Sequence, residues 1–333
     1  QSIVQNHFPI QQYTIQSIKD CSKGCDNNVF LVTLASHVAT QIEQPQEQQA
    51  SSSSSMLLNI IVRIPRKLHQ IDEDKTVAEQ SELQFPVMPM HRPCKQAWVL
   101  RLINEQCANL GLSVPKLIAL DTVNDRYMIE SYVPGIDMSD VELTPSQLQR
   151  VIFELGDVMR KLHSIRLKKF GYMSEEHDGV AQYDSWYQLF EPEFMNNVQL
   201  CHRSGFISSR VSEQLNGIWN DMKSYLQSFC DPCFVHSDLC SNNIRLTFAG
   251  ELNVNYENVT VREREVHISG IIDFADLMSG DGLYDIGRFL SHMGGDWSVV
   301  QTLEQSYGSF NQSQVDAIRF YALYFCTWLL SLC

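Results

Sequence analysis

Three oxygen-bearing side chains in the second half of the sequence have the types and the spacing that phosphate chemistry requires. Asp238 and Asn243 lie five residues apart in one polar segment, and Asp273 follows an apolar run thirty residues after Asn243. A carboxylate can orient an attacking hydroxyl and accept its proton, and carboxylate and amide oxygens are ligands that Mg²⁺ accepts readily. We therefore expect transfer of a phosphoryl group, with Asp238 as the catalytic base and Asn243 and Asp273 as metal ligands.

The same segment allows two other interpretations. An aspartate and an asparagine at this spacing also occur in ordinary turns, but the apolar runs on both sides and the second carboxylate favour the catalytic interpretation. The segment also holds four residues of zinc-ligand type within eleven positions, namely Cys230, Cys233, His236 and Cys240. Structural zinc sites usually separate two ligand pairs by a dozen residues or more, so this spacing disfavours zinc.

The first 132 residues carry the signals of a small antiparallel sheet with one helix. Runs rich in β-branched and aromatic residues predict strands at 13–20, 29–34, 56–64, 114–120 and 127–132, and helical periodicity begins after Pro93. A polar, glycine-containing turn at 21–28 joins the first two runs as a hairpin. Residues 35–55 are rich in Gln and Ser, a composition typical of a flexible insert.

The rest of the chain is predicted to be mostly helical. Val133-Pro134-Gly135 breaks the strand pattern, so we place the boundary between an N-terminal lobe, 1–132, and a C-terminal lobe, 133–333. Thr144, Pro145 and Gln147 form the signature of a helix start with a capping box, and further helices are expected at 211–229 and 312–333. The segment 251–267 extends the hairpin between Asn243 and Asp273, and it is expected to form either a solvated β-ribbon or a flap on the substrate side.

Composition narrows the choice of partners. The chain has 333 residues and a net charge of −14, of which −2 falls in 1–135 and −12 in 136–333. This balance disfavours nucleic acid and anionic membranes as partners and favours a cation for the second lobe. Ten scattered cysteines and no recognisable signal peptide or membrane span predict a cytoplasmic protein. The acidic side chains that could line a cation-binding cleft are Asp276, Asp281, Glu191 and Glu193.

Three motifs together resemble the aminoglycoside phosphotransferase family, the small-molecule relatives of protein kinases. They are Val-His-Ser-Asp-Leu-Cys-Ser-Asn-Asn at 235–243, Ile-Ile-Asp-Phe-Ala-Asp at 271–276 and Gly-Asp-Gly-Leu-Tyr-Asp at 280–285, and they are most similar to the hygromycin-type enzymes. Protein kinases fit less well, because Ser237 replaces an arginine, Phe-Ala follows Asp273 in place of Phe-Gly, and no Ala-Pro-Glu follows. The resemblance runs from about residue 13 to residue 330.

The resemblance implies roles for further residues. The phosphate-covering hairpin would hold Ser22, Lys23, Gly24 and Asn27, and Arg63 would reach the α- and β-phosphates of ATP. Glu130 and Tyr132 would belong to the hinge against which adenine stacks. His236 and Asp285 would support the catalytic loop, the latter through a buried hydrogen bond. Gln96 stands where the family has a glutamate that pairs with the basic residue, so Arg63 is expected to be less firmly oriented.

The expected fold is α+β and two-lobed, with a kinase-like arrangement of a nucleotide-binding N-terminal lobe and a catalytic, substrate-binding C-terminal lobe. The expected reaction is Mg²⁺-dependent transfer of the γ-phosphoryl group of ATP to a hydroxyl of a small, cationic molecule such as an aminoglycoside, an amino alcohol or an amino sugar. The alternative is a catalytically weak nucleotide-binding module. The two differ in whether ATP binding is accompanied by turnover.

Overall fold

The computed structural model describes residues 2–9, 12–22, 27–36, 56–65, 93–107, 110–121, 126–173, 181–249 and 264–332. Most of the Gln- and Ser-rich insert at 35–55 and most of the segment 251–267 lie outside these ranges. The contacts divide the chain into two compact units. Every described residue up to Arg101, together with Pro115–Tyr132, falls in the first unit, and Leu102–Val114 and Val133–Cys333 fall in the second.

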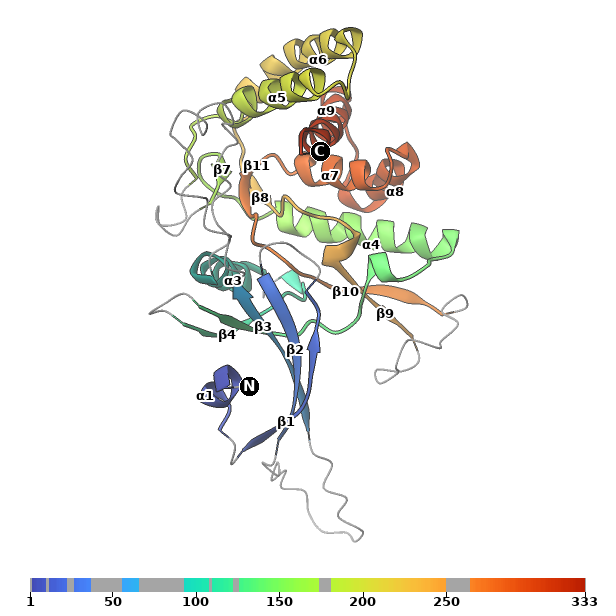
Figure 1. Ribbon diagram of the computed structural model, residues 1–333. Coiled ribbons are helices and arrows are strands. Elements are labelled where there is room, and N and C mark those ends of the chain that lie inside the picture. Colours follow the sequence, from blue (N-terminus) through green and yellow to red (C-terminus); the bar gives the residue numbers. More distant parts are fainter. Residues whose placement is uncertain are drawn as a thin grey trace, which may run out of the picture. The chain divides into compact units, whose positions relative to one another are not determined.

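The first unit is built on the expected five-stranded antiparallel sheet, which is thereby confirmed (Figure 1). The strands are β1 (Tyr13–Asp20), β2 (Asn27–Ser36), β3 (Leu57–Pro65), β4 (Leu117–Leu120) and β5 (Met128–Ser131), in the order β1-β2-β3-β5-β4. One face is covered by α3 (Pro93–Cys107), whose Ala97 and Leu100 pack on Met128. A short helix that the sequence analysis did not expect, α1 (Ser2–His7), places Val4 in a cluster with β2, β3 and β5.

The second unit combines six helices of ten or more residues, among those the structure describes, with two small sheets. The helices are α4 (Pro145–His163), α5 (Trp186–Arg203), α6 (Ser209–Ser228), α7 (Leu283–His292), α8 (Trp297–Tyr307) and α9 (Gln312–Ser331). One sheet has the order β10-β9-β6, with β6 (Ile136–Asp137), β9 (Ile244–Phe248) and β10 (Val266–Ile271). The other has the order β7-β11-β8, with β7 (Gly171–Tyr172), β8 (Cys233–Val235) and β11 (Met278–Gly280).

Local capping residues set the start of α4, and similar caps precede α6 at Ser208 and α9 at Asn311. The hydroxyl of Thr144 accepts from the backbone N–H of Gln147 and the Gln147 side chain accepts from the Thr144 N–H, so the predicted capping box is confirmed. The expected helices at 211–229 and 312–333 are α6 and α9. Helices α5, α7 and α8 were not predicted. Helix α5 packs on α7 and α9 through aromatic contacts between distant segments, which a local pattern does not reveal.

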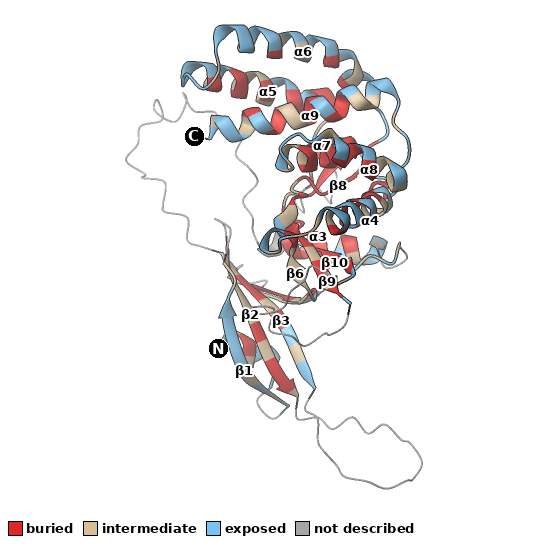
Figure 2. Ribbon diagram, turned by 90° about the vertical axis from the view of Figure 1, so that its right-hand side faces the viewer, coloured by how far each residue is buried: buried red, intermediate tan, exposed pale blue. Residues whose placement is uncertain are grey.

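An aromatic core joins α5, α7 and α9 in the second unit. Figure 2 shows the buried residues concentrated on the facing sides of these helices. The members include Trp186, Phe190, Phe194, Tyr284, Phe320 and Tyr321, all buried and in ring contact with one another. Such pairs add to the stabilisation from burial. This core supports α7, and α7 in turn carries residues that contact the segment with Ser237 and Asp238.

Gly280 allows the strand before α7 to lie against the Trp186 ring. A Cβ on Gly280 would come within 2.4–2.8 Å of three ring atoms of the fully buried Trp186. We expect Gly280→Ala to lower the unfolding free energy by about 1–3 kcal/mol, the usual cost of overpacking. Denaturant unfolding measures it. Gly217→Ala is the control, because open space surrounds this α6 glycine and alanine there should stabilise the helix by up to about 1 kcal/mol. Equal effects of the two substitutions would contradict the packing argument.

Within the described residues, no helix combines the length and apolar character needed to cross a membrane.

Candidate active site

The segment predicted to be the catalytic loop, 236–243, lies between β8 and β9 and is held in an unusual backbone conformation. Ser237 has φ +67°, in the left-handed region that non-glycine residues seldom adopt. The completely buried carboxylate of Asp285 on α7 accepts hydrogen bonds from the backbone N–H groups of His236 and Ser237, at 2.9 and 2.8 Å. His163 Nε2 on α4 lies 3.1 Å from the same carboxylate. Asp285 therefore fixes the turn that presents Asp238, through the buried hydrogen bonds expected of it.

His236 ties the loop to the strand that precedes Asp273. Its Nε2 lies 3.0 Å from the carbonyl oxygen of Ile272, and its Nδ1 lies 3.3 Å from the backbone N–H of Asp238. These partners define the tautomer, because Nε2–H must donate to the carbonyl and Nδ1 must accept from the N–H. The predicted contact with the backbone near Asp273 is present. With both ring nitrogens engaged, His236 has no nitrogen to offer to a zinc ion.

Both carboxylate oxygens of Asp238 have donors. Arg288 Nη2 on α7 donates to Oδ1 at 2.8 Å, and the amide Nδ2 of Asn243 donates to Oδ2 at 3.0 Å. Asn243 Nδ2 also donates to the backbone oxygen of Asp238 at 2.8 Å. Asp238 is partly exposed, its side chain having 34% of its surface accessible, whereas Asn243 is buried. The carboxylate is thus oriented by its neighbours and still open to solvent.

The two expected metal ligands are brought together by the backbone. Ile272 N–H donates to the carbonyl oxygen of Asn243 at 3.0 Å, so Asp273 directly follows a residue bonded to Asn243. The Asn243 amide nitrogen is used by Asp238, which leaves the amide oxygen as the atom able to bind a cation. Asp273 is partly exposed and has φ +64°. An amide oxygen and a carboxylate suit Mg²⁺, which commonly binds one or two carboxylates together with phosphate oxygens and water.

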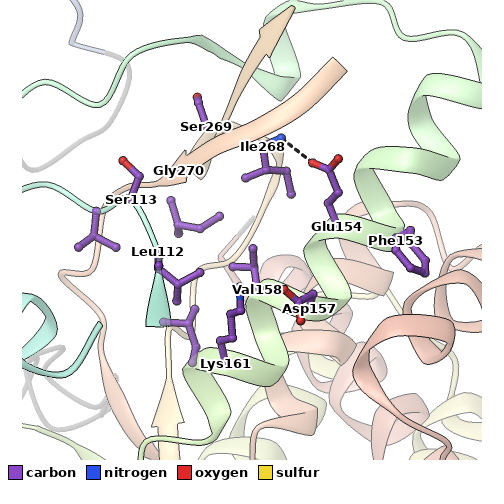
Figure 3. Close-up of a pocket in the computed structure, with 14 residues that line it drawn as sticks. Leu112, Ser113, Phe153, Glu154, Asp157, Val158, Lys161, Ile268, Ser269 and Gly270 are labelled. Atoms are coloured by element: carbon purple, nitrogen blue, oxygen red, sulfur yellow. Dashed lines mark hydrogen bonds and ion pairs between the residues drawn. The ribbon is translucent and has the colours of Figure 1, made fainter. Parts of the chain in front are cut away.

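Strand β10, which ends two residues before Asp273, is anchored to α4 and to the segment before β4. Glu154 Oε2 accepts from Ile268 N–H at 2.9 Å, and Ser113 O accepts from Ile271 N–H at 3.2 Å. Figure 3 shows these segments around a cavity of about 350 Å³, with Glu154, Asp157 and Lys161 on its α4 side. The residues that line this cavity include none of the predicted site residues. Its walls fix β10, and hence the position of Asp273.

Arg63 on β3 has a carboxylate partner that the sequence analysis did not assign to it. Its Nε lies 2.8 Å from Glu130 Oε1 on β5, and both side chains are nearly inaccessible, at 11% and 5%. A carboxylate therefore orients Arg63, and the expectation that Gln96 leaves it less firmly oriented is wrong. Gln96 is buried on α3, but the negative charge beside Arg63 comes from the neighbouring strand of the sheet. The Glu130 side chain is accordingly occupied by Arg63, so any role at an adenine hinge would fall to its backbone.

The remaining predicted nucleotide-binding residues are only partly described. Ser22 closes the end of the β1–β2 hairpin, since its hydroxyl accepts from Val29 N–H at 2.8 Å. Asn27 is buried at the start of β2, and Tyr132 is partly buried after β5. Lys23 and Gly24 lie outside the described residues. The nucleotide roles of these five residues stay predictions.

Asp281 does not line a cation-binding surface, and that expectation is wrong. It is 3% exposed and accepts from the hydroxyls of Tyr225 and Tyr321 at 2.7 and 2.9 Å and from Leu283 N–H at 3.0 Å. Burial raises its pKa above the ordinary range. Asp281 is thus part of the core.

Two other acidic residues from the sequence analysis lie on α5. Glu193 is partly buried, accepts from the Tyr324 hydroxyl and has a pKa raised by burial. Glu191 is exposed and accepts from the Tyr187 hydroxyl. These two carboxylates stay candidates for contacts with a cationic molecule.

Sequence reasoning missed Arg288. The signal in the chain is its place three residues after Asp285, because residues three apart on a helix share a face. Once Asp285 is expected to support the catalytic loop, the next residue on that face is a candidate to contact it as well.

A kinase-like phosphotransferase fold is defined by the sheet of the first unit together with two features of the second, the β8–β9 loop with Asp238 and Asn243 and the segment after β10 with Asp273. The sequence profile of the Phosphotransferase enzyme family matches residues 18–321. The chain belongs to this family.

Solved structures agree on the fold. The chain is similar to a thermostable variant of aminoglycoside phosphotransferase APH(4)-Ia in complex with ADP and hygromycin B, with a TM-score of 0.59, 13% identity, and coverage of 99% of this chain and 90% of the other. It is also similar to APH(2")-IIa in complex with streptomycin and ATP, with a TM-score of 0.52, 15% identity, and coverage of 99% and 87%. No sequence among curated proteins matches significantly.

Proposed function

We propose that this protein transfers the γ-phosphoryl group of ATP to a hydroxyl of a small, cationic molecule. The observation that carries the proposal is the catalytic loop, in which Asp238 is held by Arg288 and Asn243 while remaining open to solvent. Phosphoryl transfer requires a fixed carboxylate together with oxygens able to bind Mg²⁺, the role proposed here for Asn243 and Asp273. The similar structures bind ADP or ATP together with aminoglycosides, which supports both substrates.

The proposed roles follow the chemistry of each side chain. Asp238 accepts the proton of the acceptor hydroxyl as its oxygen bonds to the γ-phosphorus, and the bond from that phosphorus to the β,γ-bridging oxygen breaks to release ADP. Asn243 and Asp273 would hold Mg²⁺, whose contribution when bound is to neutralise phosphate charge. Arg63, oriented by Glu130, would bind the α- and β-phosphates. The net charge of −12 in 136–333 and the carboxylates of Glu191 and Glu193 favour a cationic acceptor.

A labelled-ATP assay tests the proposal. Purified protein is incubated with γ-³²P-ATP, Mg²⁺ and a panel of aminoglycosides, amino alcohols and amino sugars, with neutral sugars as the control for charge. We expect acceptor-dependent transfer of label to a cationic compound. Stabilisation by Mg-ATP without transfer to any acceptor would instead indicate the alternative, a nucleotide-binding module of low activity.

Arg63 provides a separate test of nucleotide binding. We expect Arg63→Met to remove most of the rise in Tm that Mg-AMP-PNP gives the wild-type protein, because the phosphates lose their cation. Glu130→Gln should weaken the rise by less, since it leaves the guanidinium in place. Thermal-shift titration measures both. Each variant also loses a nearly buried ion pair, at a cost of about 3–5 kcal/mol, so its Tm without nucleotide is the reference. An unchanged rise in Arg63→Met would exclude this role.

A further inference from the structure

Arg288 links the catalytic carboxylate to the last helix of the described chain. It lies on α7 one helical turn after Asp285, so both residues face the catalytic loop. Asp285 holds the backbone of the loop, and Arg288 Nη2 donates to Oδ1 of Asp238 at 2.8 Å. The Arg288 side chain is only 13% exposed. Helix α7 therefore holds the loop at two points. Asp285 binds the backbone of the loop, and Arg288 binds the side chain of Asp238.

Two aromatic rings of α9 hold the guanidinium. Its central carbon lies 4.7 Å from the ring centroid of Phe325 and 6.0 Å from that of Trp328. A cation over an aromatic face is attracted by the ring quadrupole, more strongly where water is excluded. Arg288 Nε is buried and has no hydrogen-bond partner among the described residues. Among the described residues, the rings of Phe325 and Trp328 and the carboxylate of Asp238 therefore set the orientation of the Arg288 side chain.

This arrangement fixes Asp238 before any acceptor arrives. Arg288 occupies Oδ1 and Asn243 occupies Oδ2, so rotation of the carboxylate would break a charge-assisted hydrogen bond. A carboxylate offers about four lone-pair positions, so two donors leave room for an acceptor hydroxyl. Errors of about 1 Å in the placement of a catalytic group can cost about a hundredfold in rate. Loss of the two hydrogen bonds that hold the Asp238 carboxylate would therefore slow the chemical step more than it would weaken the binding of either substrate.

We propose that Arg288 is a positioning residue for Asp238 and that Phe325 and Trp328 on α9 hold it in place for this purpose. The proposal rests on the proposed function, because it assigns the geometry of the same catalytic carboxylate. It gives α9 a part in catalysis through its contact with Arg288.

Steady-state kinetics with a cationic acceptor identified in the panel test the proposal. We expect Arg288→Met to lower kcat by about 10- to 100-fold, with KM for ATP and for the acceptor changed less than about threefold. Arg288→Lys, which restores the charge, should recover part of kcat, and Phe325→Leu, which removes a ring but keeps an apolar side chain, should lower kcat by a smaller factor. An unchanged kcat in Arg288→Met would overturn the proposal. A rise in acceptor KM at unchanged kcat would also overturn it, because it would mean that Arg288 contacts the substrate.

Arg319→Met is the matched control. Arg319 lies on α9, stacks 4.7 Å from the centroid of the Trp297 ring and pairs with an exposed aspartate, Asp316, but it does not contact the catalytic loop. Like Arg288→Met, the substitution Arg319→Met removes a guanidinium group from the face of an aromatic ring. We expect its kcat to stay within twofold of the wild-type value. A loss as large as that of Arg288→Met would show that the effect is one of general packing and would overturn the assignment.

A double-mutant cycle on stability tests the contact without turnover. Tm is measured for Arg288→Met, Asp238→Asn and the double variant, with Mg-AMP-PNP binding as the check that each is folded. We expect the losses in Tm to be clearly less than additive, because either single substitution already removes the attraction between the two charges. Additive losses would show that the pair does not form and would overturn the proposal. If the wild-type protein transfers no phosphate, the proposed function fails by that result, and the cycle still decides whether Arg288 holds Asp238.

Discussion

Asp238→Asn is expected to reduce phosphoryl transfer by about 10²- to 10⁴-fold, the usual contribution of a general base. Asparagine has nearly the same shape, and its amide oxygen can still accept from Arg288 or Asn243. It cannot accept the proton of the acceptor hydroxyl. The loss should therefore appear in kcat, while Mg-AMP-PNP continues to raise the Tm of the variant. The measurement is initial-rate transfer of label from γ-³²P-ATP, with nucleotide binding followed by thermal shift.

Asp231→Asn is the matched control for this substitution. Asp231 lies seven residues before Asp238, is exposed, and pairs with the exposed Arg166. Exposed pairs of this kind contribute about 0–1 kcal/mol to stability, so the control variant should remain folded and active. If Asp238→Asn turned over every accepted substrate at the wild-type rate, Asp238 would not be the base and the proposed mechanism would be wrong. Equal losses in both variants would indicate a general effect of charge on this segment.

The parts of the fold that were predictable are those set by local sequence. Alternating strands gave the five-stranded sheet, and Thr144 with Gln147 gave the start of α4, because a capping box needs only residues three apart. The loop predicted to be catalytic was found from the types and short spacing of its residues, and the structure shows Asp238 and Asn243 bonded to each other across five residues. Short spacing makes such contacts visible in the sequence alone.

The contacts that were not predictable join residues far apart in the chain. The Arg63–Glu130 pair spans 67 residues and depends on the pairing of β3 with β5, so Gln96 was mistaken for the relevant neighbour. The Arg288–Asp238 pair spans 50 residues and depends on where α7 packs. The sequence allows Asp281 to line a cation-binding cleft, because its local surroundings do not reveal that two tyrosine hydroxyls donate to it in the core.

The second large effect is expected at Asp285. We expect Asp285→Ala to lower the unfolding free energy by about 3–5 kcal/mol, because it leaves two buried N–H groups of the catalytic loop without their acceptor. Activity should fall even at temperatures where the variant is folded, since Ser237 and Asp238 lose their anchor. Denaturant unfolding and the labelled-ATP assay measure the two effects. Asp316→Ala, an exposed carboxylate on α9, should change stability by no more than about 0.5 kcal/mol.

The left-handed backbone of Ser237 allows the role of Asp285 to be separated from a general loss of packing. If Asp285 holds Ser237 at φ +67°, Ser237→Gly should raise phosphoryl-transfer activity more in the Asp285→Ala background than in the wild type, because glycine adopts that conformation without strain and does not need the carboxylate to enforce it. Ser237→Gly also removes the hydrogen bond from the Ser237 hydroxyl to the Asp276 carbonyl. Because this hydrogen bond is lost in both backgrounds, comparing the effect of Ser237→Gly in the wild-type and the Asp285→Ala protein cancels its contribution. A larger gain in activity from Ser237→Gly in the Asp285→Ala background would show that the Asp285 carboxylate holds the turn. The same change in activity in both backgrounds would contradict this role.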